Sequence, residues 1–96
     1  MNILVTYDVN TQDKAGRRRL RRVAKACEGC GQRVQLSVFE CRVDSTQLQR
    51  LVHRLTDEID DESDSLRIYR LADPRANAII AAGRDPYYDP DGPLVL

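Results

Sequence analysis

The spacing of the apolar residues switches between a period of two and a helical period along this 96-residue chain, and that order limits the folds open to it. Residues 2–9 alternate apolar and other side chains, which is the pattern of a β-strand. The alternation returns later with a phase slip near Ser37, so we expect a bend, bulge or hairpin between two short strands, 32–36 and 38–43. A final strand is predicted at 66–71.

Two helices are predicted between these strands. The first begins at Lys14 after a run of capping residues and stops at Gly29 and Gly31, and the second is capped by Asp44 and Ser45. Their apolar faces consist of Gly16, Leu20, Val23, Ala24 and Cys27 in the first helix and Leu48, Leu51, Val52, Leu55 and Ile59 in the second. The order strand, helix, strand, strand, helix, strand predicts an α+β, ferredoxin-like βαββαβ fold with both helices on one face of an antiparallel sheet.

The other face of such a sheet is left bare, and in a small chain this favours a homodimer formed through the open sheet face. On it we place Leu4, Thr6, Asp8, Gln35 and Ser37, while Val34, Leu36 and Val38 are expected to face inward. The chain is predicted to be a single domain, residues 1–96, with a core of about 1–72. The tail, 73–96, ends in the apolar residues 94–96, which suit an extra C-terminal strand on the partner's sheet edge; a frayed tail is the alternative.

Composition sets the size and class of the protein. Lys and Arg number 15, and Asp and Glu number 15, so the net charge of zero gives no reason to expect a nucleic-acid partner. The length and the 42% hydrophobic content suit one small core and exclude a large multidomain enzyme. No apolar run approaches the roughly 20 residues of a membrane span, and the N-terminus lacks a basic lead, so we expect a cytoplasmic protein with no membrane partner. Its three cysteines are then expected to be reduced thiols.

The zero net charge conceals two charged segments of opposite sign. Between residues 14 and 25 there are seven bases and no acid, a density typical of a surface that binds anions. These candidate nucleic-acid-binding residues are Lys14, Arg17, Arg18, Arg19, Arg21, Arg22 and Lys25. At 100° per residue Arg17 and Arg19 lie on the flanks of the helix, from which they can reach back along the rim of the sheet. The segment 57–64 carries six acids and no base, and we interpret it as a solvated helix end and loop.

Asp8 is the candidate metal-binding and catalytic residue. It is the only acid among the first twelve residues and ends an otherwise apolar strand. A loop-bonding role at the helix entry is an equal alternative. A two-fold axis at the open sheet face would bring two Asp8 side chains together, and Mg²⁺ is typically held by one or two carboxylates with water and phosphate completing its shell. Together with basic helices, such a pair describes a phosphodiesterase or a phosphate-binding scaffold.

Cysteine and histidine chemistry is less well supported. Cys27 and Cys30 form a C-x-x-C pair, but they end a helix, where the dipole does not favour a thiolate. A structural zinc would need Cys41 and His53 as the remaining ligands, so buried or capping thiols are the main interpretation. No nucleotide-binding glycine motif is present.

Several segments together resemble the small CRISPR-associated endonuclease that partners the CRISPR integrase, the Cas2 family. They are Val5-Thr6-Tyr7-Asp8-Val9, the arginine-rich helix, Gly31-Gln32-Arg33-Val34-Gln35-Leu36-Ser37-Val38-Phe39-Glu40 and Asp64-Ser65-Leu66-Arg67-Ile68-Tyr69. The resemblance implies a ferredoxin-like homodimer whose last strand packs on the partner, and a phosphodiesterase dependent on Mg²⁺ or Mn²⁺ that cleaves single-stranded RNA, duplex DNA or both.

By position, the resemblance assigns the metal to Asp8, roles in cleavage or nucleic-acid binding to Arg17 and Arg33, and supporting roles to Ser37 and Phe39. This chain departs from the pattern at Cys41, where many members have glycine, and at Ala15, which is basic in others. Which of the three consecutive arginines at 17–19 acts is therefore open.

Two functions fit the resemblance. One is a nuclease that acts with the CRISPR integrase in spacer acquisition. The other is a non-catalytic dimeric scaffold that bridges integrase dimers and binds the protospacer duplex through its backbone. A third class, an RNA-recognition module, is disfavoured because only Phe39 and Tyr7 would offer aromatic rings on the sheet face.

Overall fold

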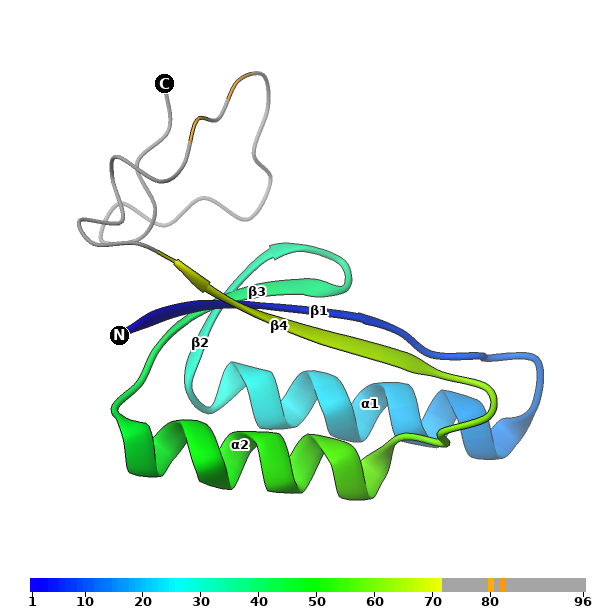
Figure 1. Cartoon of the computed structure of the whole chain (residues 1–96). Helices are drawn as coiled ribbons and strands as arrows, with labels where there is room; N and C mark the ends of the chain where they lie inside the picture. The colour runs from blue at the N-terminus through cyan, green and yellow to red at the C-terminus, as the bar shows by residue number, and fades with distance from the viewer. Residues whose placement is uncertain (72–79, 81, 83–96) are drawn as a thin grey trace.

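The computed structural model describes residues 1–71, 80 and 82, which form an antiparallel sheet and two helices (Figure 1). In chain order the elements are β1 (Asn2–Asp8), α1 (Lys14–Glu28), β2 (Gly31–Gln35), β3 (Val38–Arg42), α2 (Ser45–Glu58) and β4 (Ser65–Leu71). The sheet order is β2-β3-β1-β4, which confirms the predicted ferredoxin-like arrangement. The predicted extra strand, and with it the packing of the tail on a partner, lies outside the described residues.

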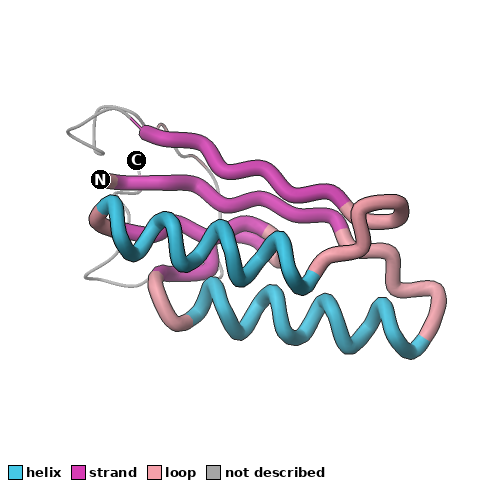
Figure 2. The backbone as a smooth tube through the Cα atoms, turned by 60° about the horizontal axis from the view of Figure 1, so that its bottom comes forward, coloured by secondary structure: helices cyan, strands magenta, loops and turns pink. Residues whose placement is uncertain are grey.

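The hydrophobic core lies between the sheet and the helices, which cover the same face of the sheet (Figures 1 and 2). β1 is central and pairs with both β3 and β4, so Val5 lies opposite Phe39 on one side and Ile68 on the other. The fully buried side chains of Val23 and Leu55 meet this row from the helices. The predicted apolar faces pack with two corrections: Val52 is 37% exposed, and Ala26 is buried although it was not predicted. Within the described residues no element covers the second face of the sheet.

Each helix begins at the predicted cap. Asp13 accepts a hydrogen bond from the backbone nitrogen of Gly16 at 2.7 Å. Asp44 and Gln47 form a reciprocal capping box, with bonds of 2.7 Å and 2.9 Å. A cap of this kind stabilises a helix by about 1 kcal/mol. Gly16 itself lies directly against the carbonyl of Asn10, where a Cβ atom would collide with the oxygen.

The β2–β3 hairpin confirms the predicted break near Ser37 but corrects the side-chain directions. Its two-residue turn consists of Leu36 and Ser37, and the register shifts between Arg33 and Gln35. The extra residue reverses the alternation, so Arg33 lies opposite Phe39 on the helix side. The inward prediction was therefore wrong for Leu36, which is 71% exposed in the turn, and for Val38, which lies opposite Thr6 on the open face, while Val34 is half-buried at the register shift.

Candidate functional site

Asp8 lies at the end of β1, exposed, on the open face of the sheet. In the register with β4 it stands opposite Ser65. The preceding residue, Tyr7, donates its backbone N–H to the carbonyl of Ser37 at 3.1 Å, which holds the β2–β3 turn against this end of β1. Within residues 1–71, 80 and 82, the carboxylate of Asp8 makes no side-chain hydrogen bond or ion pair. The loop-bonding alternative thus has no contact to support it there, and the carboxylate faces solvent.

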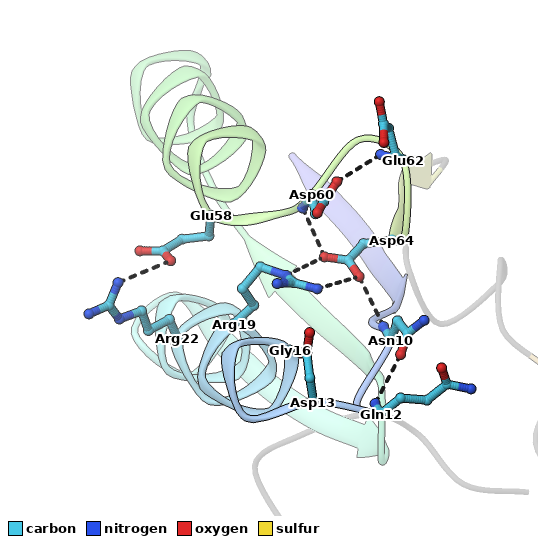
Figure 3. A network of polar contacts seen from close by, with 10 residues as sticks. All are labelled: Asn10, Gln12, Asp13, Gly16, Arg19, Arg22, Glu58, Asp60, Glu62 and Asp64. Carbon is cyan, nitrogen blue, oxygen red and sulfur yellow. Dashed lines mark hydrogen bonds and ion pairs between the residues drawn. The ribbon is translucent and has the colours of Figure 1, made fainter.

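Both strand ends beside Asp8 are held by the carboxylate of Asp64, whose side chain is 0% exposed (Figure 3). It accepts hydrogen bonds from the backbone nitrogens of Asn10 at 2.9 Å and Asp60 at 2.8 Å. The guanidinium of Arg19 adds contacts of 2.8 Å from Nε and 3.4 Å from Nη2. We call this cluster of Asn10, Arg19, Asp60 and Asp64 the Asp64 anchor. It joins the β1–α1 loop, two residues after Asp8, to the start of β4.

The pKa of Asp64 reflects this environment. Burial acts to raise the pKa, but the hydrogen bond from Arg19 and the two backbone N–H groups outweigh it, so the pKa lies below its ordinary value of 3.8. Hydrogen bonding to Asp64 likewise raises the pKa of Arg19. The interpretation of the acidic segment as solvated is therefore wrong for Asp64, which is a charged, buried residue of the fold.

The position of Arg19 on the helix flank is as predicted, but its contacts do not support its predicted role in binding nucleic acid. It lies on the flank of α1 and reaches the rim of the sheet, as its helical angle indicated. Its partner there is Asp64, and its side chain is only 20% exposed. Its guanidinium is engaged within the protein, so it is left out of the nucleic-acid surface proposed below. The sequence indicates this pair only through an acid directly before a strand and a base on the flank of a helix. Because the two residues lie 45 positions apart, no local pattern connects them.

The other bases of α1 form an exposed outer face on the helix layer. These residues, the α1 basic face, are Lys14, Arg17, Arg18, Arg21, Arg22 and Lys25. Two of them have weak internal contacts: Arg17 donates to the carbonyl of Thr11 at 3.4 Å, and Arg22 lies 3.8 Å from Glu58. Because α1 covers the face of the sheet opposite to the open one, this basic surface and Asp8 lie on different sides of a single protomer (Figures 1 and 2).

Arg33 and Phe39 join the hairpin to the core. Phe39 is fully buried and stacks with Tyr7, their ring centroids 6.3 Å apart. Arg33 lies over the Phe39 ring at 5.0 Å, donates to the carbonyl of Leu36 at 3.1 Å and pairs with Glu28 at 3.3 Å. The expectation that Phe39 and Tyr7 present rings on the open face is therefore wrong. Both rings lie on the helix side. Among the described residues only Tyr69, which is 44% exposed and pairs with Leu4, offers a ring on the open face, fewer than the two or three on which RNA-recognition modules stack bases.

The zinc alternative does not assemble. Cys30 and Cys41 are in contact, but His53 is 81% exposed on α2 and pairs with Asp57. Among the described residues no group of three or more His, Cys, Asp or Glu side chains can hold a metal ion. Asp8 therefore supplies a single carboxylate per protomer. This hard oxygen donor fits Mg²⁺ or Mn²⁺, which take one or two carboxylates together with water and phosphate oxygens, but it is not a complete site alone.

With the fold and the position of Asp8 described, the sequence can be compared with known families. Residues 1–79 match the model of the CRISPR associated protein Cas2. The chain belongs to the Cas2 family.

Relatives of the chain extend over its whole length. It is 53% identical over 96 residues to a CRISPR-associated endoribonuclease Cas2 from Nitratidesulfovibrio vulgaris, covering all of this chain and 94% of the relative. It is 54% identical over 96 residues to a CRISPR-associated endonuclease Cas2 from Halalkalibacterium halodurans, covering 100% of both. The crystal structure of Streptococcus pyogenes Cas2 at pH 6.5 superposes with a TM-score of 0.78 and 51% identity, covering 86% of this chain and 100% of that one. The family and the fold expected from the sequence are thereby confirmed.

None of the helices in the described part of the chain is long and apolar enough to span a membrane.

Proposed function

We propose that this Cas2 protein is a metal-dependent endonuclease that hydrolyses phosphodiester bonds and acts with the CRISPR integrase in spacer acquisition. The observation that carries the proposal is the exposed carboxylate of Asp8 at the end of β1, on the open face, in a chain whose relatives are named endoribonuclease or endonuclease. The Asp64 anchor supports it, because it joins the loop that follows Asp8 to the start of the neighbouring strand β4. Single-stranded RNA and duplex DNA are the two substrate classes to test.

A homodimer through the open face would complete the site. Along its central rows this face carries Leu4 between Glu40 and Tyr69, and Thr6 between Val38 and Arg67. Half of these six residues are apolar, and the charges of Glu40 and Arg67 are of opposite sign, so a second copy can pair with this surface. An isologous pairing repeats every contact, so Asp8 would be contributed by each protomer. Mg²⁺ or Mn²⁺ bound there would polarise a phosphoryl oxygen and lower the pKa of a water. The role of the protein is to hold the two carboxylates in position and to orient the strand.

Nucleic acid is proposed to bind through the α1 basic face. Its bases lie within the twelve residues from Lys14 to Lys25, whose eleven rises of 1.5 Å give about 16 Å of helix. None of the described acids except Glu58 pairs with them. Contacts of this kind go to phosphates and carry no sequence information. Arg33 has a different proposed part: its contacts with Phe39 and Glu28 position the hairpin, so it acts on the site through the turn at Ser37.

Cleavage assays with Asp8→Asn test the nuclease. The variant keeps the size of the side chain and removes its charge, and Asp61→Asn is the matched control because Asp61 is an exposed acid of the α2–β4 turn. With Mg²⁺ present, the wild type and Asp61→Asn are expected to cleave labelled single-stranded RNA or duplex DNA, and Asp8→Asn to cleave neither. Equal cleavage by all three proteins would reject the proposal.

The scaffold function remains the second candidate, and it is favoured because the exposed bases of α1 lie on the helix layer, on the opposite side of the sheet from Asp8. If the dimer bridges integrase dimers and grips the duplex, Asp8→Asn should leave duplex binding and integration intact. Arg18→Glu with Arg21→Glu should weaken duplex binding at least about tenfold and reduce the salt dependence by about one phosphate contact per residue. Arg50→Glu with Arg54→Glu changes the net charge equally on α2. If this control weakens binding as much, α1 is not the binding surface.

A further inference from the structure

A pair of cysteine side chains, Cys30 and Cys41, is in contact at the end of the sheet opposite to Asp8. Cys41 of β3 pairs with Ile3, five residues before Asp8 along β1, which corresponds to about 16 Å of strand. Cys30 precedes β2, and its Sγ lies 3.2 Å from Sγ of Cys41 and 3.5 Å from the carbonyl oxygen of Cys27. All three cysteines are free thiols. The proposed nuclease makes no use of them.

The backbone around the two sulfurs is shaped for their contact. Gly31 follows Cys30 and lies opposite Cys41 in the β2–β3 ladder. A Cβ atom at Gly31 would lie 2.5 Å from Sγ of Cys41 and would collide with the carbonyl oxygen of Glu40. The absence of a side chain at this position therefore gives the sulfur of Cys41 its place beside Cys30. The backbone N–H of Cys30 also donates to the carbonyl of Cys27 at 3.1 Å, which holds Cys30 against the C-terminal end of α1.

The three thiols differ in reactivity. Cys30 is half-buried, whereas Cys27 and Cys41 are buried. Contact with Cys41, whose S–H can stabilise a neighbouring thiolate, lowers the pKa of Cys30, and the same contact raises the pKa of Cys41. Burial raises the pKa of Cys27 to about 12. Cys30 is thus the accessible nucleophile, Cys41 its neighbour, and Cys27 unreactive.

We propose that Cys30 and Cys41 are a site of reversible oxidation, forming an intramolecular disulfide in the presence of a peroxide while Cys27 stays a thiol. The thiolate of Cys30 attacks one peroxide oxygen, so that an S–O bond forms, the O–O bond breaks and hydroxide leaves as water after protonation. The sulfur of Cys41 then attacks the Cys30 sulfenic acid: the S–S bond forms, the S–O bond breaks, and the hydroxide takes up the Cys41 proton as water. Two thiols lose two electrons, and hydrogen peroxide is reduced to two waters.

The disulfide would close the hairpin at its base. The linked segment, residues 30–41, contains all of β2, to which Arg33 belongs, the turn and most of β3. Because a cross-link restricts the unfolded and the partly opened chain, the oxidised protein is expected to unfold at a higher temperature than the reduced one and to protect the β2–β3 amides better from hydrogen exchange. Closing the pair requires the sulfurs to approach from 3.2 Å to the usual S–S bond of about 2.05 Å.

Peptide mapping of the wild type tests the proposal directly. The reduced protein is treated with hydrogen peroxide, unfolded in guanidinium chloride so that every remaining thiol is accessible, and blocked with N-ethylmaleimide. Cleavage after Glu28 and Arg33 then separates the three cysteines. We expect one blocked thiol, at Cys27, a Cys30–Cys41 cross-linked peptide with a mass loss of about 2 Da, and full reversal by dithiothreitol. Cys27→Ser should form the same cross-link, whereas Cys30→Ser should form none and should not gain in melting temperature on oxidation.

Four outcomes would overturn the proposal: three blocked thiols after oxidation, a cross-link through Cys27, cross-links only between chains, or oxygen added to Cys30 without a cross-link. The wild-type map contains all four readouts, so the result does not depend on any variant folding. It is also independent of nuclease activity, so it stands or falls separately from the role of Asp8.

Discussion

The Asp64 anchor allows one substitution to be worked out in detail, Asp64→Asn. The carboxylate accepts four contacts, two from backbone N–H groups and two from Arg19. Asparagine keeps one acceptor oxygen, loses the charge and turns an amide N–H₂ group toward the donors. Charge-assisted bonds contribute about 1.5–3 kcal/mol each, and the nearby loop can relax and admit water. We therefore expect a loss of about 2–4 kcal/mol in the free energy of unfolding, with a fall in melting temperature of roughly 10–25 °C.

Urea unfolding followed by circular dichroism measures this loss, with Asp61→Asn as the control because that exposed acid lies in the same loop. The pH dependence adds a second readout. The pKa of Asp64 is lowered in the folded state, so its stabilisation is present above its ordinary value of 3.8 and is lost as the pH falls through the folded pKa. The difference between wild type and Asp64→Asn should therefore shrink below about pH 4. If Asp64→Asn unfolds within about 0.5 kcal/mol of Asp61→Asn at neutral pH, the anchor does not carry the stability assigned to it.

Three further substitutions follow from the packing. Gly16→Ala should destabilise the protein by about 1–3 kcal/mol despite the higher helix propensity of alanine, because the new methyl group meets the carbonyl of Asn10; a neutral or stabilising effect in urea unfolding would contradict this close approach. Phe39→Leu should lower the free energy of unfolding by about 1–2 kcal/mol in the same measurement. Because it removes the ring under Arg33, it should also slow any cleavage, and an unchanged rate would mean that the position of Arg33 does not affect the site. Leu36→Ser, at the exposed turn, should change the free energy of unfolding by less than about 0.5 kcal/mol, and a larger loss would mean that this side chain packs on something.

The order of the elements could be predicted from the sequence because it depends on local periodicity. The strand β1, the capped starts of both helices and the break near Ser37 each follow from short-range patterns, and the structure has them within a residue or two. The inward face of β2 was predicted wrongly, since a single extra residue at the Arg33–Gln35 bulge reverses the alternation without changing the composition.

The contacts that shape the site could not be predicted in the same way. Arg19 and Asp64 are 45 residues apart, and although Asp64 stands directly before β4, that position does not indicate which residue it pairs with. The contact between Cys30 and Cys41 likewise depends on the hairpin register and on Gly31. Asp8 was identified correctly as a strand-end acid on the open face, because strand alternation places it there.

The most direct test of the central claim, that Asp8 holds a divalent metal for phosphodiester cleavage, is the metal dependence of cleavage by Asp8→Cys under reducing conditions. Thiolates bind Mg²⁺ poorly and softer ions such as Mn²⁺ and Cd²⁺ better. With Mg²⁺ the variant should cleave about 100-fold more slowly than the wild type or worse, and Mn²⁺ or Cd²⁺ should restore part of the rate, whereas Asp61→Cys should behave as wild type throughout. Cleavage by Asp8→Cys at the wild-type rate in Mg²⁺ would contradict the account, because residue 8 would then not be a metal ligand.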